Sequence, residues 1–301
     1  MTVASNTLKV ILLRHGQSEL NHENIFCGWI DAKLTEKGKT QARNAARLIQ
    51  DYCQKNGVSL PQVGYTSRLC RTQQTMEVML DEMGLEGSYE VVPGVDCDIG
   101  ETLNKDVVRV LQSWRLNERH YGSWQGQRKP QILKEYGKEQ YMYIRRDYQG
   151  KPPAADLKRE MMQEVNDPGS STGYEFKEPN RHQKYQLEEK SGVQLPDSES
   201  LRDVVERMRP FLTQVVLQVA RQHNLESCLM VGHGSSVRSI LKILQNISDD
   251  EIKNVDIPNA TPLVVELDKD TFKFVNRYYL DPETASIDAE KVRQEGFQNN
   301  P

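Results

Sequence analysis

The sequence lacks any apolar stretch that approaches the length of a membrane span, which argues against an integral membrane protein. Residues 10–13 form an apolar run near the N-terminus. This run is too short for the hydrophobic region of a secretory signal peptide, and Arg14 follows it at once. We therefore expect a soluble, cytoplasmic protein without a membrane partner.

Cysteine is scarce as well. The chain has five cysteines, an odd number, and none of them shows the paired spacing of a structural metal site. They are Cys27, Cys53, Cys70, Cys97 and Cys228. Such a set fits a reducing cytosol, and it predicts no metal.

An excess of positive charge is also absent. The chain has 39 Lys and Arg against 43 Asp and Glu, a net charge of −4, which argues against a nucleic-acid partner. Arginines therefore matter as a local cluster, and a small polyanion is the partner they favour. At 301 residues with 37% hydrophobic content, the chain has enough apolar side chains for a core. We favour a single domain over residues 1–301.

The first informative motif follows the apolar run of residues 10–13. Arg14, His15 and Gly16 come directly after it, so a histidine with an arginine beside it stands at the end of a buried strand. An imidazole can attack phosphorus and carry it covalently, while a guanidinium matches the oxygens of the transferred group. The alternative for a histidine at a strand end is a hydrogen-bonded core residue.

The same pattern recurs near the C-terminus. The apolar residues 228–231 lead into Gly232, His233 and Gly234, and a helical pattern follows. The first backbone N–H groups of that helix would point at an anion, and Gly16 and Gly234 would let the main chain approach it closely. Between the two motifs lie Arg71, at a predicted helix start, and a charged cluster over residues 114–122, for which the alternative is a solvated surface turn.

Strands and helices are predicted to alternate along the chain. Continuous or alternating apolar residues predict strands over residues 9–13, 62–65, 228–231, 263–267 and 273–278. Thr35 is the expected N-cap of a helix that ends near Cys53. Ser200 and Asp203 predict a capping box for a second long helix, in which Pro210 is expected to introduce a kink. This order predicts an α/β fold: a three-layer αβα sandwich with a mostly parallel central sheet and ligands at the carboxyl ends of its strands.

Seven ordered motifs closely resemble the cofactor-dependent phosphoglycerate mutases of the histidine phosphatase superfamily, over about residues 10–293. The motifs are residues 14–19, 26–29, 65–71, 114–122, 145–146, 195–201 and 232–234. The resemblance implies that His15 is the phosphoryl-accepting nucleophile, primed by 2,3-bisphosphoglycerate, and that Glu118 is the general acid and base. It also implies that Arg14, Arg71 and His233 surround the transferred phosphoryl group.

The resemblance further implies an isomerase of glycolysis and gluconeogenesis that converts 3-phosphoglycerate to 2-phosphoglycerate, needs no metal and forms a homo-oligomer. The family positions that grip the remainder of the substrate are matched here by Ser18, Asn21, Cys27, Gly28, Arg119, His120, Tyr121, Lys129, Arg145, Arg146, Gly234 and Ser235. For the pair Arg145 and Arg146, the alternative is a solvated helix face.

Several features depart from the family pattern. Residues 82–112 and 150–195 are longer than the pattern and are interpreted as polar, turn-rich insertions. As surface loops they would be tolerated decoration, but either insertion could reshape the mouth of the site or block a subunit contact. Ser235 stands where the family has asparagine, and residues 296–301 lack the lysines that end the family's tail. Two alternatives to a mutase therefore stay open: a bisphosphoglycerate-directed phosphatase, and a low-activity paralogue with a phosphoglycerate-binding or regulatory role.

Overall fold

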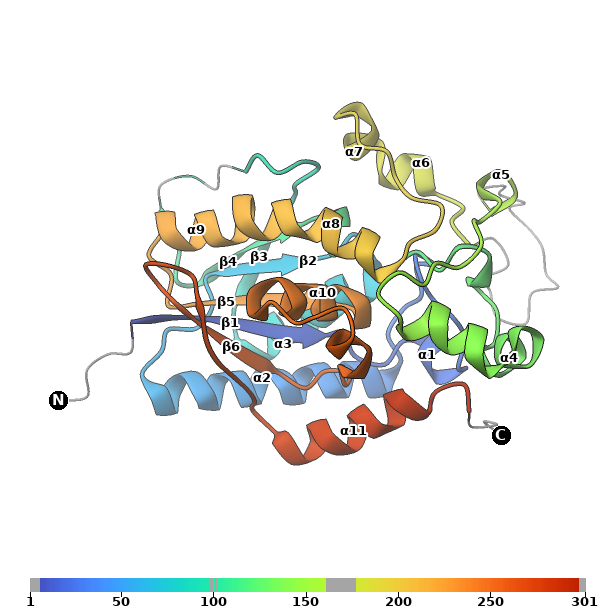
Figure 1. Cartoon of the computed structure of the whole chain (residues 1–301). Helices are drawn as coiled ribbons and strands as arrows, with labels where there is room; N and C mark the ends of the chain where they lie inside the picture. Colours follow the sequence, from blue (N-terminus) through green and yellow to red (C-terminus); the bar gives the residue numbers. More distant parts are fainter. Residues whose placement is uncertain (1–5, 98–99, 101, 161–176, 298–301) are drawn as a thin grey trace.

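The protein is described by a computed structural model over residues 6–97, 100, 102–160 and 177–297. Within these residues a seven-stranded sheet lies at the centre of the molecule, in the order β3-β4-β2-β5-β1-β6-β7 (Figure 1). The strands are β1 (Thr7–Arg14), β2 (Val63–Thr66), β3 (Glu86–Val91), β4 (Val107–Gln112), β5 (Ser227–Gly232), β6 (Leu263–Asp268) and β7 (Phe274–Tyr279). The neighbours from β3 to β1 pair in parallel, whereas β6 runs antiparallel to both β1 and β7. The predicted mostly parallel sheet is confirmed.

The apolar run of β1 is continuous because both faces of the sheet are covered. Val10 and Leu12 pack with α8 (Leu201–Phe211), α9 (Leu217–Gln222) and α10 (Gly234–Gln245) in one cluster of buried residues. Ile11 and Leu13 point the other way, into a second cluster that includes residues of α2 (Glu36–Asn56) and α3 (Cys70–Met83). Successive side chains of a strand alternate between its faces, so each apolar residue of β1 is buried on one side or the other. The three-layer αβα sandwich is therefore confirmed.

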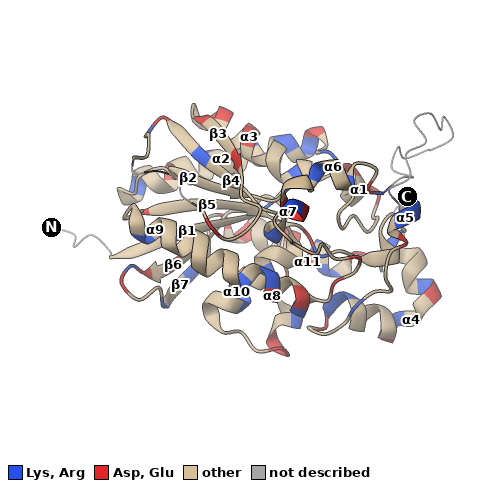
Figure 2. Cartoon of the chain, turned by 90° about the horizontal axis from the view of Figure 1, so that it is seen from above, with Lys and Arg blue, Asp and Glu red and all other residues tan. Residues whose placement is uncertain are grey.

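The remaining helices lie at the ends and margins of this sandwich. They are α1 (Glu19–His22), α4 (Lys129–Arg146), α5 (Leu157–Glu160), α6 (Arg181–Lys184), α7 (Gln186–Lys190) and α11 (Pro282–Gln294), with 3₁₀ turns at Trp114–Leu116, Gly122–Trp124 and Glu251–Asn254. Figure 1 shows α1 and α4 to α7 grouped beyond one end of the sheet, towards which the arrow of β1 points. Figure 2 shows basic and acidic residues interspersed over the helices on that side of the molecule. Within the described ranges, no helix combines the length and apolar character that crossing a bilayer demands.

The predicted helix signals are present in the structure. The hydroxyl of Thr35 accepts a hydrogen bond from the backbone of Gly38 at 3.1 Å, so it caps α2. Ser200 and Asp203 form a reciprocal capping box at the start of α8. Pro210 lies inside α8, and a π-helical turn over Leu212–Val216 follows it before α9 continues the helix. The expected irregularity therefore takes the form of a π-turn, a common way for a helix to absorb a local disruption.

The interpretation of residues 82–112 as a turn-rich insertion is wrong, because this segment holds β3 and β4. In β4 the side chains of Val108, Val110 and Leu111 are buried. Strand β3 is the edge of the sheet and is almost wholly exposed, so its sequence is polar and shows no apolar pattern. An edge strand with one neighbour needs little apolar surface, and for that reason the pattern did not reveal it.

The second longer segment packs against the body of the protein. In its described part, the Glu178 carboxylate is buried against His120, and the Tyr185 hydroxyl accepts a hydrogen bond from Asn117 at 2.8 Å. Tyr185 also stacks near Trp29, with ring centroids 5.2 Å apart. These contacts fix the charged segment 114–122 from outside, so residues 177–195 are more than surface decoration.

Candidate active site

A cavity of about 80 Å³ lies beyond the carboxyl ends of β1 and β5. Arg14 ends β1, and Gly234 and Ser235 begin the helix that follows β5, so the two histidine motifs meet at this cavity. Eleven of the residues that the sequence nominates line it: Arg14, Asn21, Cys27, Gly28, Glu118, Tyr121, Lys129, Arg145, Arg146, Gly234 and Ser235. The structure thus brings together residues from positions far apart in the chain.

His15 is held with one ring nitrogen fixed and the other directed at an arginine. Its Nδ1 lies 2.7 Å from the carbonyl oxygen of Gly16, and its Nε2 lies 3.2 Å from Nε of Arg71. A carbonyl only accepts and a guanidinium only donates, so Nδ1 carries the proton and Nε2 the lone pair. Burial, with the charges of Arg71 and Arg14, holds the pKa of His15 well below 6.5. The imidazole is therefore neutral at physiological pH and can act as a nucleophile at Nε2.

His233 lies edge-on to His15, with ring centroids 5.0 Å apart. Its Nε2 is 2.9 Å from the Ser67 hydroxyl, and its backbone N–H donates to the Ser236 hydroxyl at 2.7 Å. His233 is the N-cap of α10, so the start of that helix faces the same region as His15. Burial, with the charge of Arg71, also holds the pKa of His233 well below 6.5.

These two buried imidazoles predict a loss of stability in acid. Because both pKa values are lowered in the fold, the unfolded chain binds more protons once the pH drops through about 6.5. The free energy of unfolding should therefore decrease from about pH 6.5 towards pH 5, as measured by urea denaturation. His15→Gln should flatten this dependence, whereas His182→Gln, at an exposed histidine, is the control that keeps it. Equal slopes in both variants would contradict the prediction.

The arginines beside His15 are anchored by backbone carbonyls. The two terminal nitrogens of Arg71 donate to Ile30 and Gly28 at 2.9 and 2.8 Å, which leaves its Nε for His15. Arg14 donates from Nη1 to the carbonyl of Ile257 at 2.9 Å. Both guanidinium groups are therefore fixed in orientation before any anion binds, as electrostatic stabilisation of a transferred group requires.

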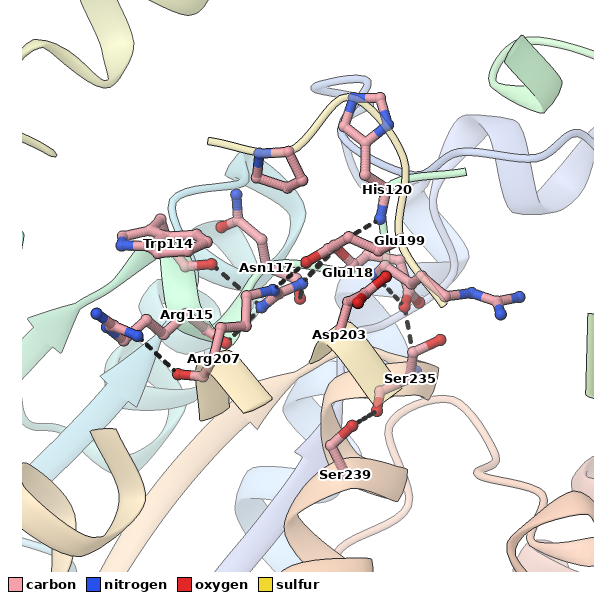
Figure 3. A network of polar contacts seen from close by, with 12 residues as sticks. Trp114, Arg115, Asn117, Glu118, His120, Glu199, Asp203, Arg207, Ser235 and Ser239 are labelled. Carbon is pink, nitrogen blue, oxygen red and sulfur yellow. Dashed lines mark hydrogen bonds and ion pairs between the residues drawn. The ribbon is translucent and has the colours of Figure 1, made fainter. Parts of the chain in front are cut away.

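Glu118 faces the cavity across the start of α10. One carboxylate oxygen accepts hydrogen bonds from the backbone N–H of Ser235 at 3.1 Å and from that of Arg119 at 2.7 Å; Figure 3 shows the contact with Ser235. A Cβ added to Gly234 would lie 3.7 Å from the other oxygen of Glu118 and 3.9 Å from Cζ of Arg14. The carboxylate and the guanidinium thus face a gap that the missing side chain keeps open. The close approach of the main chain at Gly234 to a bound anion stays a prediction.

Gly16 packs closely against α2. A Cβ at this position would lie 2.3 Å from the carbonyl oxygen of Gly38 in that helix. The chain after β1 therefore requires a glycine here to pack against α2, and the predicted approach of Gly16 to a bound anion stays a prediction.

Four arginines on the cavity wall have buried nitrogens with no hydrogen-bond partner among the described residues. These atoms are Nε of Arg14, Nη1 of Arg145, Nη2 of Arg146 and Nε of Arg238. A bound anion would pair these donors, so the cluster makes this cavity a candidate anion site. Arg238 and Asp256, which binds Arg146 at 2.5 Å, line this cavity but carry no signal in the sequence.

Six nominated residues do not line the cavity. His15, Arg71 and His233 form the group described above, and the other three are Ser18, Arg119 and His120. Ser18 caps α1 and donates to Asn21 at 3.0 Å. Arg119 donates to the carbonyls of Ile144 and Arg145 at the end of α4. His120 places its Nε2 2.6 Å from Glu178, on the side of the second insertion. In this structure these three residues hold the walls of the cavity.

A buried pair that the sequence did not nominate clamps the segment carrying Glu118 (Figure 3). Arg207, on α8, donates from one nitrogen to the carbonyls of Asn117 and Glu118, each at 3.0 Å. The same guanidinium binds the carboxylate of Glu199 at 2.6 and 3.0 Å, and Glu199 accepts from the backbone N–H of His120 at 2.9 Å. The sequence offers one signal for this pair: Arg207 is charged although it lies within the apolar stripe of α8.

Arg207 is therefore expected to act as a positioning residue for Glu118. Arg207→Lys keeps the charge but loses the fork of donors, so kcat should fall by about tenfold to a hundredfold while KM changes little. Steady-state kinetics would show this split, and thermal melting would confirm that the variant is folded. Arg202→Lys, on the exposed side of the same helix, is the matched control. A folded Arg207→Lys protein with an unchanged kcat would remove Arg207 from this role.

Comparison with known proteins accords with this geometry. The sequence profile of the histidine phosphatase superfamily (branch 1) matches residues 10–94 and 167–279, more than half of the chain. The chain is 62% identical to phosphoglycerate mutase 3 of Saccharomyces cerevisiae over 304 residues, which cover 100% of both proteins. The chain belongs to the phosphoglycerate mutase family of the histidine phosphatase superfamily.

Other relatives extend the family match. The chain is 64% identical to phosphoglycerate mutase 2 of S. cerevisiae, over 99% of this chain and 98% of the relative. It is 37% identical to the 2,3-bisphosphoglycerate-dependent phosphoglycerate mutase of Corynebacterium diphtheriae, over 96% and 98% of the two chains. The resemblance to this family in the sequence is confirmed.

Solved structures show the same fold. A mycobacterial glucosyl-3-phosphoglycerate phosphatase with VO₃ matches with a TM-score of 0.56 at 21% identity, over 85% of this chain and 92% of that chain. The alpha-ribazole phosphatase of Shigella flexneri matches with a TM-score of 0.56 at 15% identity, over 91% and 96%. At these identities the likeness concerns the fold alone.

Proposed function

We propose that this protein is a phosphoglycerate mutase that interconverts 3-phosphoglycerate and 2-phosphoglycerate through a phosphohistidine at His15. The observation that carries the proposal is the state of His15: a neutral imidazole with its lone pair at Nε2, which faces Nε of Arg71. The full-length identity to two yeast phosphoglycerate mutases supports the choice of substrate.

Glu118 and His15 divide the chemistry between them. To accept a phosphoryl group, Nε2 of His15 attacks phosphorus; a P–N bond forms, the P–O bond breaks, and Glu118 gives a proton to the departing oxygen. In the opposite direction Glu118 takes the proton of a substrate hydroxyl, whose oxygen attacks phosphorus as the P–N bond breaks. Arg14, Arg71 and His233 surround the group in flight, where charge spreads over its oxygens.

The charges that line the cavity suit 2,3-bisphosphoglycerate as the phosphoryl donor that primes His15. The unused nitrogens of Arg14, Arg145, Arg146 and Arg238 suit a ligand with two phosphates and a carboxylate. When bound, the donor supplies the phosphoryl group that makes His15 competent for transfer. We propose Lys129, Arg145 and Arg146 as the residues that hold its non-reacting end, with Asn21, Cys27, Gly28 and Tyr121 completing the wall.

We also propose the metal requirement, the cellular compartment and the oligomeric state of the enzyme. The guanidinium groups supply the positive charge, so no metal is needed. We propose a cytoplasmic role in glycolysis and gluconeogenesis, in keeping with five free cysteines. The homo-oligomer that the family resemblance implies also stays a prediction, which light scattering during gel filtration would test.

A coupled assay tests the proposed function directly. Purified protein treated with EDTA is mixed with 3-phosphoglycerate, and formation of 2-phosphoglycerate is followed through enolase added with its own magnesium. Turnover should depend on added 2,3-bisphosphoglycerate and survive the chelation step. Release of inorganic phosphate without 2-phosphoglycerate would favour the phosphatase alternative. Binding of phosphoglycerates without turnover would favour the regulatory paralogue.

Ser235 is expected to keep turnover below what this site can reach. An asparagine at this position would add an amide donor and acceptor at the cavity, where serine has one hydroxyl. Ser235→Asn should therefore raise kcat/KM for 3-phosphoglycerate by about tenfold, the value of one good hydrogen bond. The ratio of bisphosphoglycerate hydrolysis to transfer should fall as well.

The competing interpretation of Ser235 is a neutral helix cap. In the structure the N-cap of α10 is His233, and the hydroxyl of Ser236 completes the capping contacts. Ser236→Ala is thus the control that should lower the melting temperature, whereas Ser235→Asn should change kinetics. If Ser235→Asn alters neither kinetic ratio, Ser235 does not limit catalysis.

A further inference from the structure

The described C-terminal tail brings a carboxylate into the cavity. Helix α11 ends at Gln294, and Figure 1 shows that its end lies beside α1 and α4. Val292, in the last turn of the helix, and Glu295, directly after it, both line the cavity that holds Arg14 and Glu118. The tail therefore forms part of the wall of the site.

Glu295 is bound to two of the cations that we assign to the substrate. One of its carboxylate oxygens lies 2.5 Å from Nζ of Lys129 and 3.4 Å from Nη2 of Arg145. The Lys129 and Arg145 side chains are only 8% exposed, and that of Glu295 is 25% exposed. The backbone is tied down as well, because Arg145 donates to the carbonyl of Val292 at 2.8 Å. The Glu295 carboxylate thus occupies Lys129 and Arg145 as a bound anion would, although it belongs to the same chain.

The size of the cavity gives a second, independent observation. About 80 Å³ is well below the roughly 300 Å³ of the smallest typical ligand pockets. A larger cavity of about 540 Å³ adjoins it, and Asn21, Val292 and Glu295 line both. The end of α11 thus separates the small cavity from the large one, and its displacement would join them.

Charge balance indicates what displaces the tail. Burial alone would raise the pKa of Glu295, but the charges of Lys129, Arg14 and Arg145 lower it to about 2, so the carboxylate is ionised throughout the physiological range. A phosphoglycerate also offers a carboxylate and a phosphate, and Lys129 and Arg145 cannot pair fully with Glu295 and with substrate at once. Substrate and tail therefore compete for the same donors.

Resting on the proposed function, we infer that Glu295 sets the affinity of this site as a tethered competitor. Its carboxylate occupies the anion subsite of Lys129 and Arg145 in the free protein, and the anionic end of the substrate must displace it. Displacement weakens the binding of substrate but leaves His15 and Glu118 untouched. Glu295 is thus an affinity-determining residue rather than a catalytic one.

The test is Glu295→Gln, which keeps the shape of the side chain and removes its charge. The dissociation constants of 3-phosphoglycerate and of inorganic phosphate, measured by calorimetry, should fall by about fivefold to tenfold. KM should fall in step, while kcat stays within about twofold. Glu290→Gln is the matched control, because Glu290 lies on the same helix, pairs with Arg293 and does not line the cavity. It should change neither constant.

A second variant guards against an effect of the glutamine itself. Glu295→Ala leaves α11 and the chain end in place and removes the carboxylate without adding an amide, so it should bind both anions more tightly as well. Unchanged or weaker binding in both variants would overturn the inference and make Glu295 a brace for Lys129. Calorimetry requires no turnover, so tighter binding by a protein without mutase activity would uphold the competitor and refute the proposed function.

Discussion

Replacement of His15 by alanine is expected to abolish the phosphoenzyme. Wild-type protein incubated with labelled 2,3-bisphosphoglycerate should retain label that is lost in acid and stable in alkali, as a phosphorylated imidazole is. His15→Ala should retain none, because no other described group combines a neutral Nε2 with Arg71 at 3.2 Å. Mutase turnover should fall by about 10⁴-fold or more, as for the loss of other enzymatic nucleophiles.

The matched control for this variant is His182→Ala. His182 lies on the second insertion with 71% of its side chain exposed, so its loss should affect neither label nor turnover. Far-ultraviolet circular dichroism would show that both variants are folded. Label at the wild-type level in His15→Ala would refute His15 as the carrier.

Glu118→Gln is expected to give the second largest loss. Glutamine keeps the shape of the side chain and can still accept from the backbone N–H groups of Ser235 and Arg119, but it can no longer exchange a proton. Turnover should therefore fall by about 10²- to 10⁴-fold, with KM for 3-phosphoglycerate nearly unchanged. Rapid-quench measurement should show that phosphorylation of His15 slows too, because the departing oxygen has lost its proton donor.

Glu139→Gln is a suitable control for the effect of removing one negative charge. Glu139 lies on α4, is exposed and does not line the cavity. A Glu118→Gln enzyme with kcat within twofold of wild type would require another acid and base. Asp256 would be the next candidate, as the third carboxylate on the cavity wall.

The central part of the fold could be predicted because its signals lie within short stretches of the sequence. The run in β1 is apolar at every buried position, and the caps at Thr35 and Ser200 act within three residues of the helix start. Strand β3 could not be predicted in this way. Its residues are exposed and its pairing with β4 joins positions about twenty residues apart, so its stability comes from the neighbouring strand rather than from its own pattern.

The residues of the site also fall into two groups: those that lie in sequence motifs and those that depend on distant partners. His15, Glu118 and His233 lie in recognisable motifs, and the structure brings their segments to one cavity. Arg207 and Glu295 act through partners 89 and 166 residues away in sequence, so the local sequence does not reveal these partners. From the sequence, the tail differs from the family pattern only in lacking lysines. The structure adds that the tail carries a carboxylate which already occupies two cations of the site.

The central claim is that the phosphoryl group passes through His15 on its way between substrates, and a chase experiment tests it most directly. Protein labelled from 2,3-bisphosphoglycerate is freed of donor, the label is mapped by mass spectrometry, and unlabelled 3-phosphoglycerate is then added in a quenched-flow apparatus. We predict that the label lies on His15 and moves into phosphoglycerate products at least as fast as steady-state turnover. Label that stays on His15 while turnover continues, or that lies on another residue, would contradict the mechanism.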